Sequence, residues 1–223
     1  MSRPLLVLCV LSLGCGIAHG EIKTAGENPS QVLLSPEKEI ELALKAAPVH
    51  LRNEAAVYVF GKRGYEKARA GTNGFNCIVN RDGTQDGDNT LHPTCWDPEG
   101  SKTILPVMLR VGELIAQEKS AAEIKRDIDD GFARGRFHSP GKSGIAYMLA
   151  GDVKFDPKTG QLESTVFAPH YMLYAPGVTN ADIGMSKEAT TPGLPFVYSG
   201  YSGGARTTYI IVMAADSAGH MMH

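Results

Sequence analysis

The chain has 223 residues, of which 43% are hydrophobic and 21% are charged. These are the values of an ordinary globular protein, and they exclude collagen-like, coiled-coil and fully disordered chains. The formal net charge of −2 leaves no excess of positive charge that would attract a polyanion, so we expect no nucleic-acid partner.

The first 20 residues have the pattern of a secretory signal peptide. Arg3 supplies a positive start, an apolar run covers residues 5–18, and the sequence Ala18-His19-Gly20 is a small-x-small cleavage site. Cleavage near Gly20 would export the mature chain to the periplasm or the extracellular space. An uncleaved anchor is the alternative, but the run is shorter than the roughly 20 apolar residues of a membrane span. No later segment is long enough to span, so we expect no transmembrane segment in the mature chain.

Cleavage would remove two of the four cysteines, Cys9 and Cys15. Lipid attachment at Cys15 is an alternative, although Ser12 stands where a leucine-type residue is preferred. In an oxidising compartment we expect the remaining Cys77 and Cys95 to form a disulfide. Such a bridge contributes about 3 kcal/mol in the chain-entropy model. A catalytic thiol is the other interpretation, but no sequence neighbour obviously activates Cys77.

The N-terminal half predicts one helix followed by strands. Residues 21–34 show no period, and we expect a flexible segment there before a domain that covers residues 35–214. Ser35, Pro36 and the acidic residues after them begin a helix that Pro48 ends. The β-branched and aromatic composition of the next pieces predicts strands separated by glycine-rich turns, at residues 55–60, 65–70 and 75–80.

The C-terminal half predicts two helices and then more strands. An apolar stripe from Ile104 marks the first helix, and the capping box of Ser120 and Glu123 begins the second. Strands are expected at residues 145–149, 162–167, 171–174, 196–198 and 207–213, with a turn at 156–160 and a flexible tail at 215–223. This order favours a single α+β domain whose mostly antiparallel sheet packs with a pair of helices.

Two short motifs match catalytic patterns but lack their structural context. Residues 200–204 fit the G-x-S-x-G pattern around Ser202, yet a strand-like segment follows, so we expect a glycine-rich hairpin turn there. Residues 141–143 contain the G-K-S core of a phosphate-binding loop, but Arg136 replaces the first glycine and a strand follows. Neither motif is expected to carry chemistry.

The polar segment at residues 81–93 offers weak calcium candidates. Oxygen ligands at alternate positions, with glycine at the sixth, allow a chain to wrap around the ion. Pro93 stands where a bidentate acid would be required, so a solvated loop closed by the disulfide is the default expectation. The histidines show no zinc-type spacing, and the sequence identifies no cofactor. The three candidate ligands are Asp82, Asp86 and Asp88.

The segment at residues 169–182 is the best candidate for a ligand site. His170 can exchange a proton near neutral pH, and Asp182 follows it in a polar loop. The tyrosines of this segment have apolar rings with hydroxyl tips, which suits the wall of a concave pocket. The alternative is a purely structural role, in which the segment forms a strand that faces the core and is followed by a capped turn. The candidate ligand-binding residues are Trp96, His138, Tyr171 and Tyr174.

Four segments together resemble an uncharacterised group of exported bacterial proteins. They are residues 74–77, 95–100, 169–176 and 179–184, and the likeness extends over residues 57–212. The resemblance implies bacterial export and a single folding unit. It implies no activity and transfers no catalytic role to any residue.

Three functions follow as hypotheses. The first is an exported soluble domain that binds a small molecule or a protein partner. The second is a metal-assisted or general-base hydrolase that uses His170 and Asp182. The third is a structural or interaction protein of the cell envelope. A cleft would favour the first two hypotheses, whereas a flat aromatic patch would favour the third.

Overall fold

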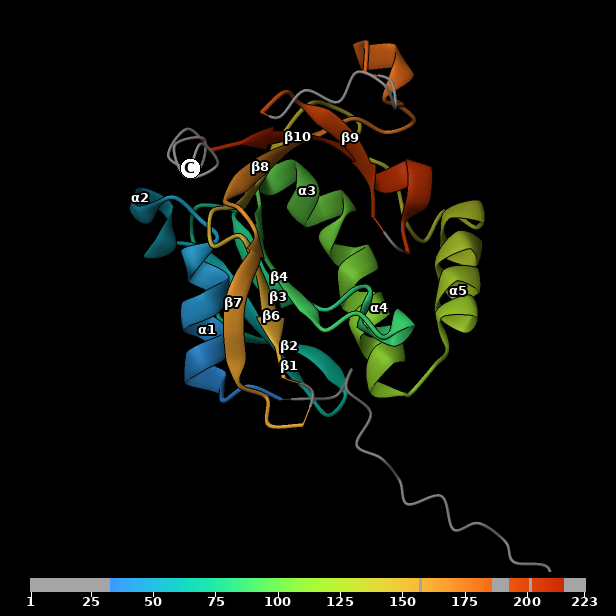
Figure 1. Cartoon of the computed structure of the whole chain (residues 1–223). Coiled ribbons are helices and arrows are strands. Elements are labelled where there is room, and N and C mark those ends of the chain that lie inside the picture. Colours follow the sequence, from blue (N-terminus) through green and yellow to red (C-terminus); the bar gives the residue numbers. More distant parts are fainter. Residues whose placement is uncertain (1–32, 157, 186–192, 201, 215–223) are drawn as a thin grey trace, which may run out of the picture.

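The computed structural model describes residues 33–156, 158–185, 193–200 and 202–214 (Figure 1). Within these ranges, ten strands form one sheet in the order β2-β1-β3-β4-β5-β8-β10-β9, and β6 pairs with β4 and β7. The pairs are antiparallel except for β1 with β3. The predicted α+β class with a mostly antiparallel sheet is therefore confirmed. The predicted signal peptide and the tail at 215–223 lie outside the described residues.

The helices and strands follow the predicted order, with additions. The helices are α1 (Pro36–Lys45), α2 (Val49–Arg52), α3 (Pro98–Thr103), α4 (Leu105–Ala116) and α5 (Ala121–Ala133). The strands are β1 (Ala56–Gly61), β2 (Gly64–Arg69), β3 (Asn76–Asn80), β4 (Thr90–Trp96), β5 (Ile145–Met148), β6 (Asp152–Phe155), β7 (Leu162–Phe167), β8 (His170–Tyr174), β9 (Phe196–Ser199) and β10 (Thr208–Met213). The prediction missed α2, α3, β4 and β6, and the chain reverses between β6 and β7, which form an antiparallel pair.

One face of the sheet is covered by α1, which packs on β1, β3 and β4 (Figure 1). Ser35 caps this helix by accepting a hydrogen bond from the Lys38 N–H, as the sequence predicts. Leu34, at the end of the segment expected to be flexible, is buried beneath it. We call this cluster the α1-side core: Leu34, Leu42, Ala43, Ala46, Ala47, Ala55, Val57, Cys77, Val79, Leu91, Cys95 and Phe155.

A fully buried ion pair joins α1 to the end of β3. The Glu39 carboxylate is 0% exposed and the Arg81 guanidinium 1%. Arg81 donates two hydrogen bonds to it, with N–O distances of 2.7 and 3.0 Å, and the Phe60 N–H donates a third. The expectation of a solvated loop from residue 81 is therefore wrong, because this pairing and the contacts of Asp82 bury the beginning of the loop.

The predicted disulfide is present. Cys77 on β3 and Cys95 on β4, which are 18 positions apart in sequence, stand directly opposite each other and are joined. Both cysteines are buried in the α1-side core, so the bridge reinforces the centre of the sheet. It is compatible with an oxidising compartment.

The other face of the sheet is covered by α4, with α5 outside it (Figure 1). Gly112 in α4 lets the helix approach β2 closely, because a Cβ at this position would stand 2.4 Å from the Tyr65 ring. Side chains from α4, α5 and six strands, with the flanking Ile104 and Phe137, form the α4-side core: Phe60, Ile78, Trp96, Ile104, Leu105, Val107, Met108, Val111, Leu114, Ile115, Ile124, Ile128, Phe137, Ala146, Met148, Met172, Tyr174, Tyr209 and Ile211.

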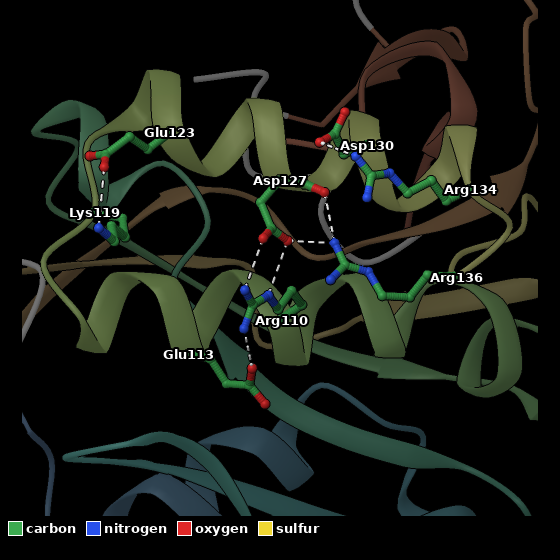
Figure 2. A network of polar contacts seen from close by, with 8 residues as sticks. All are labelled: Arg110, Glu113, Lys119, Glu123, Asp127, Asp130, Arg134 and Arg136. Carbon is green, nitrogen blue, oxygen red and sulfur yellow. Dashed lines mark hydrogen bonds and ion pairs between the residues drawn. The ribbon is translucent and has the colours of Figure 1, made fainter.

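A network of ion pairs joins α5 to α4, and we call it the α4–α5 strut. Figure 2 shows Arg110 of α4 reaching across to Asp127 of α5, which accepts two hydrogen bonds of 3.0 and 2.8 Å from it. Arg136 donates to the same carboxylate at 2.6 Å, and Arg110 also pairs with Glu113. The predicted capping box of Ser120 and Glu123 begins α5.

One edge of β4 pairs with two different strands, so the sheet divides there into two branches, and we call this point the fork of β4. Its first residues, Thr90 and Leu91, pair with β6, and its last residues, Cys95 and Trp96, pair with β5. Pro93 lies between the two pairings. Proline donates no ladder hydrogen bond, so a point where one partner ends and the next begins tolerates it. This position explains why the strand continues through a proline that the sequence pattern assigns to a loop.

Among the described residues, no helix combines the length and the apolar character required to cross a membrane.

Candidate functional site

A cavity of about 280 Å³ lies where the sheet divides. Residues from both branches line it, together with Met108 of α4. The lining residues are Asn80, Asp82, Asp88, Thr90, His92, Thr94, Trp96, Met108, Met148, Asp152, Val166, Phe167, His170, Met172, Phe196, Tyr198, Gly200, Thr207, Tyr209 and Ile211. Along β4 itself, the lining residues run from the polar Thr90 and His92 to the aromatic Trp96.

The direction of β4 sets this gradient. His92, Thr94 and Trp96 occupy alternate positions and share one face of the strand. At the usual rise of a strand, His92 and Trp96 are about 13 Å apart along the chain. The cavity thus offers a polar end near His92 and an apolar end near Trp96.

A histidine and a carboxylate are paired at the polar end. The Nδ1 atom of His92 on β4 lies 2.9 Å from the Oδ1 atom of Asp152 on β6. Because a carboxylate only accepts, the proton of this bond resides on Nδ1, and Nε2 is the ring nitrogen that faces away from Asp152. Asp152 therefore orients the His92 ring, as a carboxylate orients a catalytic or ligand-binding histidine.

His170 stands at the start of β8 and is only 2% exposed. Its Nδ1 donates to the carbonyl oxygen of Ala168 at 2.9 Å, and the Phe167 ring packs edge-on against it. Burial lowers the pKa of His170 below 6.5; the Ala168 hydrogen bond and Asp152 raise it by less, and the nearby His92 lowers it slightly. The ring is therefore held neutral, with an acceptor nitrogen at Nε2.

Asp82 connects the β3–β4 loop to the β9–β10 connection. Its carboxylate accepts hydrogen bonds from the Ser202 N–H at 3.0 Å and the Ser202 hydroxyl at 2.6 Å, and from the Gln85 amide. Ser202 is buried and lies in the connection between two antiparallel strands, so the prediction of a turn for the G-x-S-x-G pattern is confirmed. The described backbone contains no nucleophile elbow at this serine.

The three calcium candidates differ in their contacts and in their exposure to solvent. The neutral donors on Ser202 and Gln85 occupy the Asp82 carboxylate, Asp86 is exposed, and Asp88 accepts from Thr90 at 2.6 Å. Within the part of the chain that the structure describes, no group of three or more His, Cys, Asp and Glu side chains is arranged to hold a metal ion. The residues present thus indicate structural hydrogen bonds at this loop.

The aromatic end of the cavity lies against α4. The indole N–H of Trp96 donates to the Tyr209 hydroxyl at 3.4 Å, and burial raises the pKa of Tyr209. Near the His92 end, Phe167 lies opposite Asp152 and packs on the His170 ring, and it meets Phe196 edge to face with ring centroids 6.3 Å apart. These rings and the neighbouring methionines provide a wall that suits an apolar body.

Of the predicted catalytic and ligand-binding residues, only Trp96 and His170 line the cavity, and the calcium candidates Asp82 and Asp88 line it as well. Tyr174 shares their face of the sheet, but its hydroxyl lies 2.8 Å from both Asp97 and the Ile145 carbonyl and serves as an internal anchor. Tyr171 alternates with His170 along β8 and therefore belongs to the opposite face of that strand.

His138 and Asp182 do not line the cavity, contrary to the prediction. His138 is exposed after α5. Asp182 accepts hydrogen bonds from the Thr179 N–H and hydroxyl, at 2.8 and 2.7 Å, and these bonds lower its pKa. Asp182 therefore caps a surface turn, which is the purely structural role given as the alternative for this segment.

The sequence interpretation missed residues that complete the cavity, above all Asp152, Phe167, Phe196 and Tyr209. Asp152 belongs to β6, which was not predicted, and it lies 60 positions from His92. The period-2 pattern of His92, Thr94 and Trp96 could have placed these three on one face, but Pro93 obscured the strand.

The chain matches no protein-family model, and neither a curated protein nor a solved structure matches it. The functional argument therefore rests on the cavity.

Proposed function

We propose that this protein is an exported small-molecule-binding protein and that the cavity at the fork of β4 is its ligand site. The observation that carries the proposal is an aromatic cavity that contains a small set of oriented polar groups, His92 with Asp152 and His170. Binding sites for small molecules combine an apolar wall with a few fixed polar groups in this way.

The volume indicates the size of the ligand. A cavity of roughly 150 Å³ accommodates benzene, so one of about 280 Å³ suits a molecule of about ten non-hydrogen atoms. A pocket of this kind favours ligand binding over the envelope-interaction hypothesis, which requires a flat aromatic patch.

Export is part of the proposal. It is supported by the signal-peptide pattern of the first 20 residues and by the buried Cys77–Cys95 disulfide, a bond typical of oxidising compartments. Amino-terminal sequencing of the protein recovered from a periplasmic or culture fraction should begin near Glu21, whereas an intact Met1 there would contradict cleavage.

Trp96 provides a direct binding assay, because it is the one tryptophan of the chain and it lines the cavity. Three probes share a phenyl body and differ in the charge of the head: phenethylamine, 2-phenylethanol and phenylacetate. We expect at least one to change the Trp96 fluorescence saturably. If none does, and calorimetry also detects no binding, the proposed function is wrong.

A matched pair of variants links such binding to the cavity. Val166 on β7 lines the cavity and is 51% exposed, so Val166→Trp should close the mouth without overpacking a buried site. Glu163 on the same strand is exposed and does not line the cavity, which makes Glu163→Trp the control. Calorimetry should show binding lost in the first variant and kept in the second.

The paired His92 and Asp152 favour a second candidate, a general-base hydrolase that uses this pair instead of His170 and Asp182. Positioned general bases contribute about 10²- to 10⁴-fold to a rate. Hydrolysis of 4-nitrophenyl acetate should then fall by that factor in His92→Gln and stay unchanged in His138→Gln. Equal rates in both variants would reject this candidate and leave ligand binding untouched.

A further inference from the structure

The charged residues that line the cavity are of one sign. Its described lining residues include aspartates and histidines but neither lysine nor arginine. Arg81 is the sequence neighbour of Asp82, yet its guanidinium is committed to the buried Glu39 carboxylate. No basic side chain among these lining residues offers a counter-charge to an anionic ligand.

The hydrogen bonds to two of these aspartates do not cancel their charge. Asp82 accepts from the hydroxyl and N–H of Ser202 and from the Gln85 amide, all of which are neutral. Asp152 accepts from the imidazole of His92. The Asp82 carboxylate, whose partners are all neutral, keeps its negative potential in this partly water-excluded space, and Asp152 adds a second carboxylate.

The aromatic walls act in the same direction. Trp96, Phe167, Phe196, Tyr198 and Tyr209 line the cavity, and the face of an aromatic ring carries a negative electrostatic potential. Rings of this kind attract an organic cation by about 0.5–2 kcal/mol in cation–π contacts, most strongly where water is excluded.

The two histidines add hydrogen-bond acceptors. Nδ1 of His92 is bonded to Asp152 and Nδ1 of His170 to the Ala168 carbonyl, so Nε2 is in each ring the nitrogen that can accept a hydrogen bond. Acceptors and carboxylates suit a ligand head that both carries positive charge and donates hydrogen bonds.

We propose that the cavity binds a small organic cation, namely a protonated amine on an aromatic or branched apolar body of about ten non-hydrogen atoms. The inference rests on the proposed small-molecule-binding function and names its ligand class. The ammonium group lies toward Asp152 and His170, and the apolar body lies toward Trp96 and Tyr209.

The test compares the three phenyl probes at about pH 8 by Trp96 fluorescence and calorimetry. Phenethylamine is expected to bind at least about tenfold more tightly than 2-phenylethanol, because only the amine gains the ionic and cation–π attraction. Phenylacetate is expected to bind most weakly. Added salt should weaken the amine more than the alcohol.

Asp152→Asn removes one charge from the cavity and keeps an oxygen that can accept from His92. We expect it to weaken phenethylamine by about tenfold and to leave 2-phenylethanol unchanged. Asp182→Asn is the control, since this exposed carboxylate lies outside the lining and also accepts only neutral donors. It should change neither affinity.

The outcomes separate the two proposals. If phenylacetate or the alcohol binds as tightly as the amine, or if Asp152→Asn leaves the amine unaffected, the cation inference is wrong and small-molecule binding stands. If no probe binds, both proposals are wrong. Equal loss of the amine in Asp152→Asn and Asp182→Asn would also overturn the inference, because the effect would not belong to the cavity.

Discussion

The two faces of the sheet are built differently. The α1-side core contains small residues, a disulfide and the adjoining Glu39–Arg81 ion pair, all closed to solvent. The α4-side core contains larger aromatic and sulfur-containing residues and opens into the cavity at the fork of β4. The comparison suggests that the two faces have different roles. The α1 face stabilises the pairing of the strands, and the α4 face contains the proposed ligand site.

The largest effect is expected from the buried ion pair. Glu39→Ala leaves Arg81 charged and buried without its carboxylate, which costs about 3–5 kcal/mol of unfolding free energy. Glu41→Ala on the same helix removes an exposed carboxylate that pairs with Lys45 and should leave the unfolding free energy nearly unchanged. Urea unfolding measures both variants. Similar values for the two would show that the α1 face does not depend on this pair.

The disulfide should have the next largest effect. Replacing Cys77 and Cys95 together by Ala removes a bridge with a sequence separation of 18, which contributes about 3 kcal/mol in the chain-entropy model. Phenethylamine affinity, once measured, should stay within twofold or so because the bridge lies in the other core. A large loss of affinity with little loss of stability would reverse the assignment of roles to the two faces.

A smaller effect is expected from the strut between α4 and α5. Asp127→Asn weakens two bonds from Arg110 and one from Arg136, and it should cost about 1 kcal/mol. Figure 2 also shows Asp130, whose pairing with Arg134 is exposed and 3.6 Å long. Asp130→Asn should therefore be nearly neutral in thermal unfolding, and equal losses would contradict the strut.

The smallest effect concerns the pH dependence of stability. The pKa of His170 is lower in the folded protein than its ordinary value of 6.5, chiefly through burial. The unfolded chain therefore binds a proton first as pH falls, and stability is lost from about pH 6.5 downward to the folded pKa. His170→Gln should flatten this part of the stability profile, whereas the exposed His138→Gln should not. A profile unchanged by His170→Gln would contradict the burial effect.

Local features of the fold were predictable because their causes lie within a few residues. Ser35 and Ser120 cap helices through bonds to residues three positions ahead, and the capping box was readable from Ser120 and Glu123. The hydrophobic periods of α4 and α5 were equally local.

The site was less predictable because its contacts join distant segments. His92 and Asp152 are 60 positions apart, Trp96 and Tyr209 are 113 apart, and Asp82 and Ser202 are 120 apart. No local pattern specifies such pairs, and a wrong strand assignment at Pro93 hides one half of the site.

The sequence by itself determined the α+β class, the cysteine pair and most of the strands and helices. Those properties follow from periodicity, capping and composition, which act over short distances along the chain. Only the tertiary structure decided that β4 carries β5 and β6 on one edge, and that the cavity therefore lies where the two branches separate. A sheet of this order depends on pairings between strands remote in sequence, whose registers are set by the packing of the whole sheet.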